Sequence, residues 1–186
     1  MFGKKPTPPP AQPRSQAAPQ PAQPAGLALQ VLTVGYIADG YIAPIEMPLV
    51  GYLNVPTQVT IAMNSAHVRV LGANVDTGQT LPEIIVPKST MIAIIPKNDA
   101  AVRSAGIQLP PRTERALIYA GPFLIRGSFR LMGDMPLRNL FNALSGDMLA
   151  VSDAEIHCQL PGVRFPDTKP TLMVLNKTRV QLYHPI

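Results

Sequence analysis

The chain has 186 residues, of which 46% are hydrophobic and 15% are charged, and its formal net charge is +5. A single cysteine, Cys158, excludes an intramolecular disulfide and any metal site built from several cysteines. No run approaches the roughly 18 consecutive apolar residues of a membrane-spanning helix, and no apolar stretch of a secretory signal follows the basic N-terminus. We therefore expect a cytoplasmic protein without a membrane span.

The first 26 residues are dominated by proline, alanine and glutamine, with eight prolines among the first 24. Proline has no amide hydrogen to donate and a fixed backbone angle, so such a run suits neither a helix nor a sheet. Segment 1–26 is therefore predicted to be a disordered, polyproline-like tether.

The first predicted β unit covers residues 27–97. Apolar and β-branched patterns predict strands at 27–34, 36–45, 58–63, 65–71, 84–86 and 91–95. Gly40 lies inside the second strand, as Gly127 does in the second unit, and a missing side chain there allows a bulge or a sharp bend. The last two strands, IIV and MIAII, are apolar on both faces. We expect both to be buried, between sheets or against another part of the chain.

The second predicted β unit, 115–186, repeats this pattern after a linker at 98–114. The sequence FLIRGSFRLMGDMPLRNLFN at 123–142 matches YIADGYIAPIEMPLVGYLN at 36–54. The closing hairpin MVLNKTRVQLYHP likewise matches IIVPKSTMIAIIP. The chain is therefore predicted to contain one small module used twice.

Each unit also contains one predicted short helix. Four apolar residues of the second unit follow the helical spacing i, i+3, i+4 and i+7, namely Leu137, Leu140, Phe141 and Leu144. The matching segment of the first unit begins at Pro48. The sequence thus predicts a mainly β protein: two tandem small barrel-like β modules, each with one short helix, after a disordered Pro-rich tail.

Catalytic and cofactor motifs are not recognisable in this sequence. It contains no phosphate-binding glycine loop, no nucleophile elbow and no zinc-ligand spacing. Its three histidines, His67, His157 and His184, do not align between the two units, which argues against a duplicated histidine site. Cys158 takes the place of Val70 and is expected to be a small core hydrophobe.

Asp153, Glu155 and His157 share one face of a predicted strand, and carboxylate with imidazole is metal-ligand chemistry. A solvated strand face is the favoured interpretation, because the first unit has Ser65, His67 and Arg69 at these positions. We therefore predict no catalytic residue, no cofactor and no metal, and a protein that is not an enzyme.

Basic residues are concentrated in the second unit and include Arg126, Arg130 and Arg138. Together with Phe123, Phe129 and Tyr183 they allow a nucleic-acid interpretation, because basic grooves with stacking rings bind single strands. Six acidic residues lie among these bases, so the support for nucleic-acid binding is weak.

One aligned position reverses its charge between the units: Asp39 in the first corresponds to Arg126 in the second. If equivalent faces of the units meet, or if chains stack head to tail, this reversal converts repulsion into an ion pair. Asp39 and Arg126 are therefore candidate interaction residues, together with Arg130 and Arg138.

Four segments carry a resemblance to a known family: Ile125 to Gly127, Pro136 to Asn142, Asp153 to Ile156 and Asn176 to Val180. The order of elements resembles Sm-like barrels, and more specifically an uncharacterised bacterial small β-domain. Sm-like proteins form rings and bind uridine-rich RNA, which the resemblance would imply here. The Asp and Asn of their RNA-contacting loop have no clear equivalents in this chain, so only the barrel-like architecture is carried over.

The charged share of 15% is below the roughly 25% of an average soluble domain, which favours a surface partly covered by a partner. The sequence therefore predicts a non-catalytic bacterial interaction or scaffold protein, with a protein partner or self-association. The alternative is an RNA-binding protein of Sm-like type.

Overall fold

The computed structural model describes residues 26–73, 78–105, 112–131, 133–143, 145–163, 165–166 and 168–186. Of the predicted tail, only Gly26 falls within these residues, so the predicted disorder lies outside the described part of the chain.

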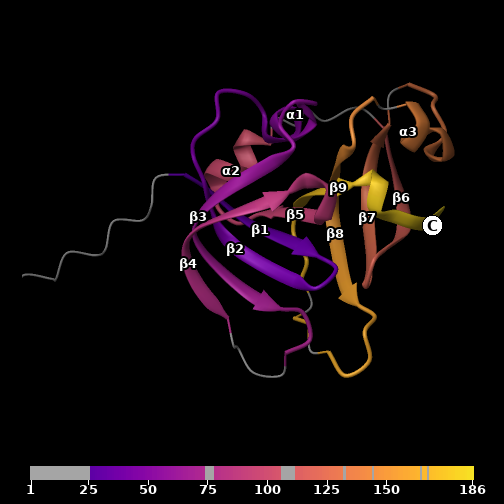
Figure 1. Ribbon diagram of the computed structural model, residues 1–186. Coiled ribbons are helices and arrows are strands. Elements are labelled where there is room, and N and C mark those ends of the chain that lie inside the picture. Colours follow the sequence, from indigo (N-terminus) through magenta and orange to yellow (C-terminus); the bar gives the residue numbers. More distant parts are fainter. Residues whose placement is uncertain are drawn as a thin grey trace, which may run out of the picture.

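Ten strands and three α-helices follow one another in an order that is similar in the two halves of the chain (Figure 1). The first half contains β1 (Leu27–Thr33), β2 (Tyr36–Ile42), α1 (Leu49–Asn54), β3 (Thr60–Val70), β4 (Gln79–Pro87) and β5 (Met91–Pro96). Helix α2 (Asp99–Ser104) follows. The second half contains β6 (Arg112–Ala120), β7 (Phe123–Leu131), α3 (Leu137–Ala143), β8 (Met148–Cys158), β9 (Leu172–Asn176) and β10 (Val180–Pro185).

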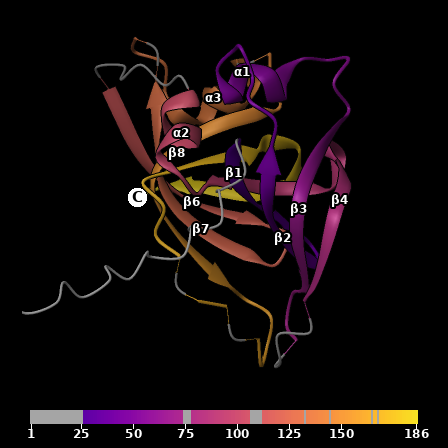
Figure 2. The same ribbon diagram turned by 90° about the vertical axis from the view of Figure 1, so that its left-hand side faces the viewer.

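All ten strands belong to one sheet with the order β10-β6-β7-β8-β9-β5-β1-β2-β3-β4. Every pairing is antiparallel, and β4 and β10 form the two outer edges. Figure 2 shows the strongly curved sheet from the side, with the helices toward one end of the molecule. The predicted mainly β class is confirmed.

The sheet is open, which corrects the expectation of two closed barrel-like units. Strand β5 pairs with β9 of the other half, and no pairing of β5 with β4 closes the first half within the described residues. The apolar strand MIAII accounts for this arrangement, because all residues of β5 are buried where the halves meet. The long apolar stretch is thus covered by the second half of the same chain.

The two halves have matching strand registers. In each half the second and third strands shift register, between Asp39 and Tyr41 and between Arg126 and Ser128. The predicted irregularity at the two glycines is therefore present, and a Cβ on Gly127 would lie 2.3 Å from Val151 Cγ1. On the facing strands Ser65 and Asp153, at equivalent positions, both adopt a φ of 49°.

The helices differ from the prediction at one place. Of the predicted apolar residues of α3, Leu137 and Leu140 are buried, Phe141 is half-buried, and Leu144 lies outside the described residues. In α1, Leu49 and Leu53 are buried. The segment predicted as linker, 98–114, contains α2 and the start of β6. The side chain of Asn98 caps α2 by accepting a hydrogen bond from the amide of Ala101 at 2.9 Å, a standard helix start that sequence reading overlooked.

Two apolar clusters form the core, and each draws residues from both halves. Ile92 and Ile95 of β5 pack in the cluster of the second half, whereas Met148 and Val174 of the second half pack in the cluster of the first. The halves therefore share their cores. No helix in the described residues is long and apolar enough to cross a membrane.

Candidate interaction site

The joint between the halves, which we call the seam, is a short antiparallel pairing of β5 with β9. Ala93 stands opposite Leu175, and Ile94 stands opposite Val174. All four side chains are buried. Because each strand uses the edge that its own half leaves unpaired, the seam joins two different edges rather than two equivalent ones.

A side chain at the end of α1 extends the seam beyond the two strands. Asn54 Nδ2 donates to the carbonyl of Met148 at 2.9 Å, and the amide of Met148 donates to Asn54 Oδ1 at 2.9 Å. Gly146 makes room for this contact, since a Cβ there would lie 2.4 Å from Asn54 Cγ. The first half thus binds the backbone of the second through one amide group.

Asn176 makes the reciprocal contact from the second half. Its side chain is 2% exposed, and its Nδ2 donates to the carbonyls of Met91 at 3.0 Å and Lys88 at 3.2 Å. Its Oδ1 accepts from the amide and the hydroxyl of Thr178 at 3.0 and 2.7 Å. A buried amide with all of these partners fixes the relative position of the two hairpin turns.

Lys88 lines a cavity of about 500 Å³ at the same place. Its Nζ donates to the carbonyls of Leu53 at 2.7 Å and Val55 at 2.9 Å, at the end of α1. Desolvation by burial lowers the pKa of Lys88, and the nearby Asp147 carboxylate opposes this shift. The lysine therefore secures α1 against the hairpin and, with both carbonyls bound, serves the structure of the seam.

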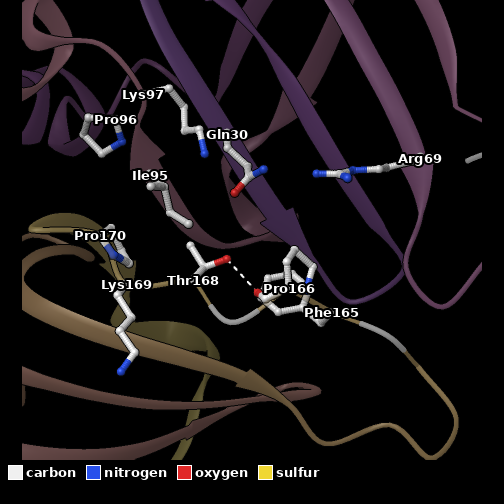
Figure 3. Close-up of a pocket in the computed structure, with 10 residues that line it drawn as sticks. All are labelled: Gln30, Arg69, Ile95, Pro96, Lys97, Phe165, Pro166, Thr168, Lys169 and Pro170. Atoms are coloured by element: carbon white, nitrogen blue, oxygen red, sulfur yellow. Dashed lines mark hydrogen bonds between the residues drawn. The ribbon is translucent and has the colours of Figure 1, made fainter.

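A groove of about 490 Å³ lies between the halves on another side of the seam (Figure 3). Gln30, Arg69 and Lys97 reach it from the first half, and the segment around Phe165 and Thr168 reaches it from the second. Its basic side chains are partly neutralised. Arg69 pairs with Asp39 at 3.2 Å, and Lys169 pairs with Glu155 at 3.1 Å.

Asp39 and Arg126 do not pair with each other within the described part of the chain, and a pairing of these charges between chains stays a prediction. Asp39 accepts hydrogen bonds from Gln30 at 2.8 Å and Arg69 at 3.2 Å, both in its own half. Arg126 stands opposite Glu155 in the register of β7 and β8, and its charge contributes to lowering the pKa of that carboxyl group. The charge of each of these two candidate residues is therefore balanced within its own half.

The other two candidate residues also lie apart. Arg130 lines a hollow of about 290 Å³ with Val102 and Arg103. Arg138 lies in α3, where its carbonyl accepts a hydrogen bond from the hydroxyl of Tyr183 at 2.9 Å. The four predicted interaction residues are thus spread over β2, β7 and α3 rather than gathered into one site.

The aromatic rings proposed for base stacking are mostly occupied in the core. Phe123 and Phe129 are fully buried, and Tyr183 packs against Phe141 with ring centroids 4.3 Å apart.

The strand face with Asp153, Glu155 and His157 was considered for metal binding. Among the described residues no group of three His, Cys, Asp or Glu side chains is placed to hold a metal ion. Glu155 accepts a hydrogen bond from Lys169, which lowers the pKa of this carboxyl group.

The outer edges of the sheet carry the most exposed apolar strand residues. Ile85 of β4 is 58% exposed, and Leu182 of β10 is 66% exposed. Ile85 belongs to the strand IIV, for which burial is expected from the sequence, and its exposure contradicts that expectation. The apolar segment from Ile84 to Val86 thus lies on an outer edge, with Val86 buried, Ile84 half-buried and Ile85 exposed.

Comparisons with known proteins add no relative. A scan against protein-family models, a search of curated proteins and a search of solved structures each return no match to this chain.

Sequence reasoning missed the residues that make the seam, namely Asn54, Gly146 and Asn176. Asn54 is matched by Asn142 in the other unit, so it does not stand out as special. The signal lay in the differences: Gly146 corresponds to Gln58, and Asn176 corresponds to Pro87. Divergence between repeated units marks positions where the two halves have different neighbours.

Proposed function

We propose that this chain is a non-catalytic interaction protein of scaffold type, built from two copies of a small β module, and that it associates with itself through the outer edge at β4. The observation that carries the proposal is the exposure of Ile85 at 58% on that edge. Full burial of an isoleucine side chain contributes about 1.5–3 kcal/mol, so an edge of this kind gains from being covered.

The β4 edge is also the longer of the two outer edges, although Pro82 and Pro87 leave gaps in its row of backbone donors. It has nine residues, against six in β10, and its apolar segment from Ile84 to Val86 is the longest on either outer edge. An unpaired edge offers a row of backbone donors and acceptors to another strand. Two β4 strands that pair about a two-fold axis would use the same surface of both chains, and the unpaired backbone groups of each edge would then bind those of the other.

Edge variants test this association by absolute mass from light scattering over a range of concentrations. We expect the wild-type chain to reach twice its 20.0 kDa mass, and Ile85→Lys to remain at 20.0 kDa. A lysine on an edge strand disfavours pairing because its charge must be desolvated. Leu182→Lys on β10 is the matched control and should leave the dimer intact.

Two results would refute this proposal. A wild-type chain of 20.0 kDa at every concentration would remove self-association. If Leu182→Lys dissociated the dimer and Ile85→Lys did not, the association would use the edge at β10 and not the edge at β4. Far-UV circular dichroism of each variant checks that the fold is retained.

RNA binding of the Sm-like type is the second candidate. Its support is the basic character of the second half and the presence of Lys97 and Lys169 beside the groove between the halves. Purification without nuclease tests it in the same experiment, through the ratio of absorbance at 260 and 280 nm. Co-purified nucleic acid that dissociates steeply with salt would favour RNA binding, because phosphate contacts release counterions. A low ratio with a salt-insensitive mass favours the scaffold.

A further inference from the structure

The two outer edges are the structural counterparts of the two edges that meet in the seam. Strand β4 corresponds to β9, because each pairs with the third strand of its half, from Thr60 with Pro87 and from Met148 with Asn176. Strand β10 corresponds to β5 and shows the same register shift at its start. A second copy of the chain that repeated the seam would therefore place its β10 beside β4.

The side chain of Gln58 occupies the position that such a copy would need. In the seam Asn54 binds the backbone of Met148 over Gly146. In the first half the residue that corresponds to Met148 is Thr60, and Gln58 replaces the glycine. Gln58 Nε2 donates to the carbonyl of Thr60 at 2.8 Å, so this acceptor is already used within the chain.

The geometry at Gly146 shows how severe this obstruction is. A Cβ on Gly146 would lie 2.4 Å from both Cγ and Oδ1 of Asn54, well inside van der Waals contact. Gln58 carries such a Cβ and a longer side chain, which is further held by a hydrogen bond to the Tyr52 hydroxyl at 3.1 Å. The incoming residue of another copy, Asn142, would meet it at the same position.

A second substitution removes the hydrogen bonds that hold the two hairpin turns together in the seam. Asn176 donates to the carbonyls of Lys88 and Met91, whereas its counterpart Pro87 has no side-chain donor. The outer joint therefore lacks two hydrogen bonds that the seam possesses. Asn142, by contrast, is exposed and makes no side-chain hydrogen bond to another described residue, so one half of the contact is intact.

We infer that the β4 side of the first half is a docking surface for β10 and Asn142 of a second copy of this chain, held closed by Gln58 and Pro87. The closure allows the seam to form once, between the two halves of one chain, and stops it from repeating between chains. It restricts wild-type association to like edges and thereby limits the assembly to a closed dimer rather than an open series.

Opening the surface is the direct test. The double variant Gln58→Gly with Pro87→Asn gives the first half the residues that the second half has at the corresponding positions, Gly146 and Asn176. We expect head-to-tail association with masses above 40 kDa that rise with concentration, where 40 kDa is twice the chain mass of 20.0 kDa. Removing the obstruction and adding two hydrogen bonds should lower the dissociation constant by at least roughly tenfold.

Further substitutions in this background identify the contact. Adding Leu182→Lys or Asn142→Ala should return the mass to that of the wild-type chain, whereas Ile186→Ala, beyond the end of β10, should not. A folded double variant with the wild-type mass at every concentration would overturn the inference. So would assembly that persists with Leu182→Lys, because β10 would then not be the partner.

This test is independent of the association through like edges. If the wild-type chain is a monomer, that association fails, yet the opened variant still has to assemble. If the double variant does not fold, Gln58→Gly alone provides the readout, because position 58 lies outside the strands and helices. The single variant should show the same concentration dependence at higher protein concentration, and an unchanged mass would count against the inference.

Discussion

Replacing Asn176 is the most direct test of how the two halves are held together. The side chain makes four hydrogen bonds: two to the carbonyls of Lys88 and Met91 in the first half, and two to Thr178 beside it. It is 2% exposed, so water does not replace these bonds without rearrangement. A net value of about 1 kcal/mol for each bond gives a predicted loss of about 3–4 kcal/mol on Asn176→Ala.

Urea unfolding followed by circular dichroism measures this loss, and Asn142→Ala is the matched control. Asn142 is the asparagine at the end of α3, is exposed and makes no side-chain hydrogen bond to a described residue. Its removal should change the unfolding free energy by less than about 0.5 kcal/mol. A loss below about 1 kcal/mol for Asn176→Ala would refute the assignment of this residue as the main polar link.

Asn176→Asp separates the donors of this side chain from its acceptor. The carboxylate keeps the acceptor for Thr178 but presents an oxygen to the carbonyls of Lys88 and Met91. Burial among carbonyls should raise the pKa of the introduced aspartate above its unfolded value. A raised pKa gives a contribution that is complete below the unfolded pKa and is lost as pH rises through the folded pKa. We therefore expect this variant to gain stability, relative to the wild type, as pH falls.

Two further outcomes are expected. Gly127→Ala places a Cβ 2.3 Å from Val151 Cγ1 and should cost about 1–3 kcal/mol in thermal unfolding, whereas Gly51→Ala, with no atom within 4 Å of the new Cβ, should stabilise α1 by about 0.5–1 kcal/mol. Lys169→Gln removes the hydrogen bond that lowers the pKa of Glu155, so an NMR titration should show that this pKa rises. In the wild type the lowered pKa gives a small stabilisation above the unfolded pKa, which is lost as pH falls through the folded pKa. The variant should lack this stabilisation. An unchanged titration of Glu155 would contradict the observed pair.

Local structure followed from the sequence to a large extent. The apolar patterns predicted most of the strands, although the two strands predicted at 58–63 and 65–71 form the single strand β3. The helical spacing predicted α3 with Leu137 and Leu140 buried. Gly40 and Gly127 marked the places where the register shifts. These features depend on residues close in sequence, whose side-chain directions are set by the periods of strand and helix.

The candidate interaction residues stay a prediction, and the contacts between the halves were not foreseen. The charge reversal at Asp39 and Arg126 drew attention to two residues that are each balanced within their own half. The actual joint depends on Asn54 and Asn176, whose partners are backbone groups of the other half. A backbone partner leaves no mark in the sequence, because every residue carries the same amide and carbonyl.

The sequence by itself determined that the chain is a β protein with a repeated pattern, since composition, periodicity and turn residues act locally. Only the tertiary structure decided which edges pair. An apolar strand such as β5 is buried equally well against its own half or the other one, and its composition does not distinguish them. The choice rests on contacts between residues far apart in the chain: Gly146 admits Asn54, whereas Gln58 occupies the equivalent place. Gly146 thus allows the seam to form, and Gln58 prevents the same joint at β4, which stays exposed.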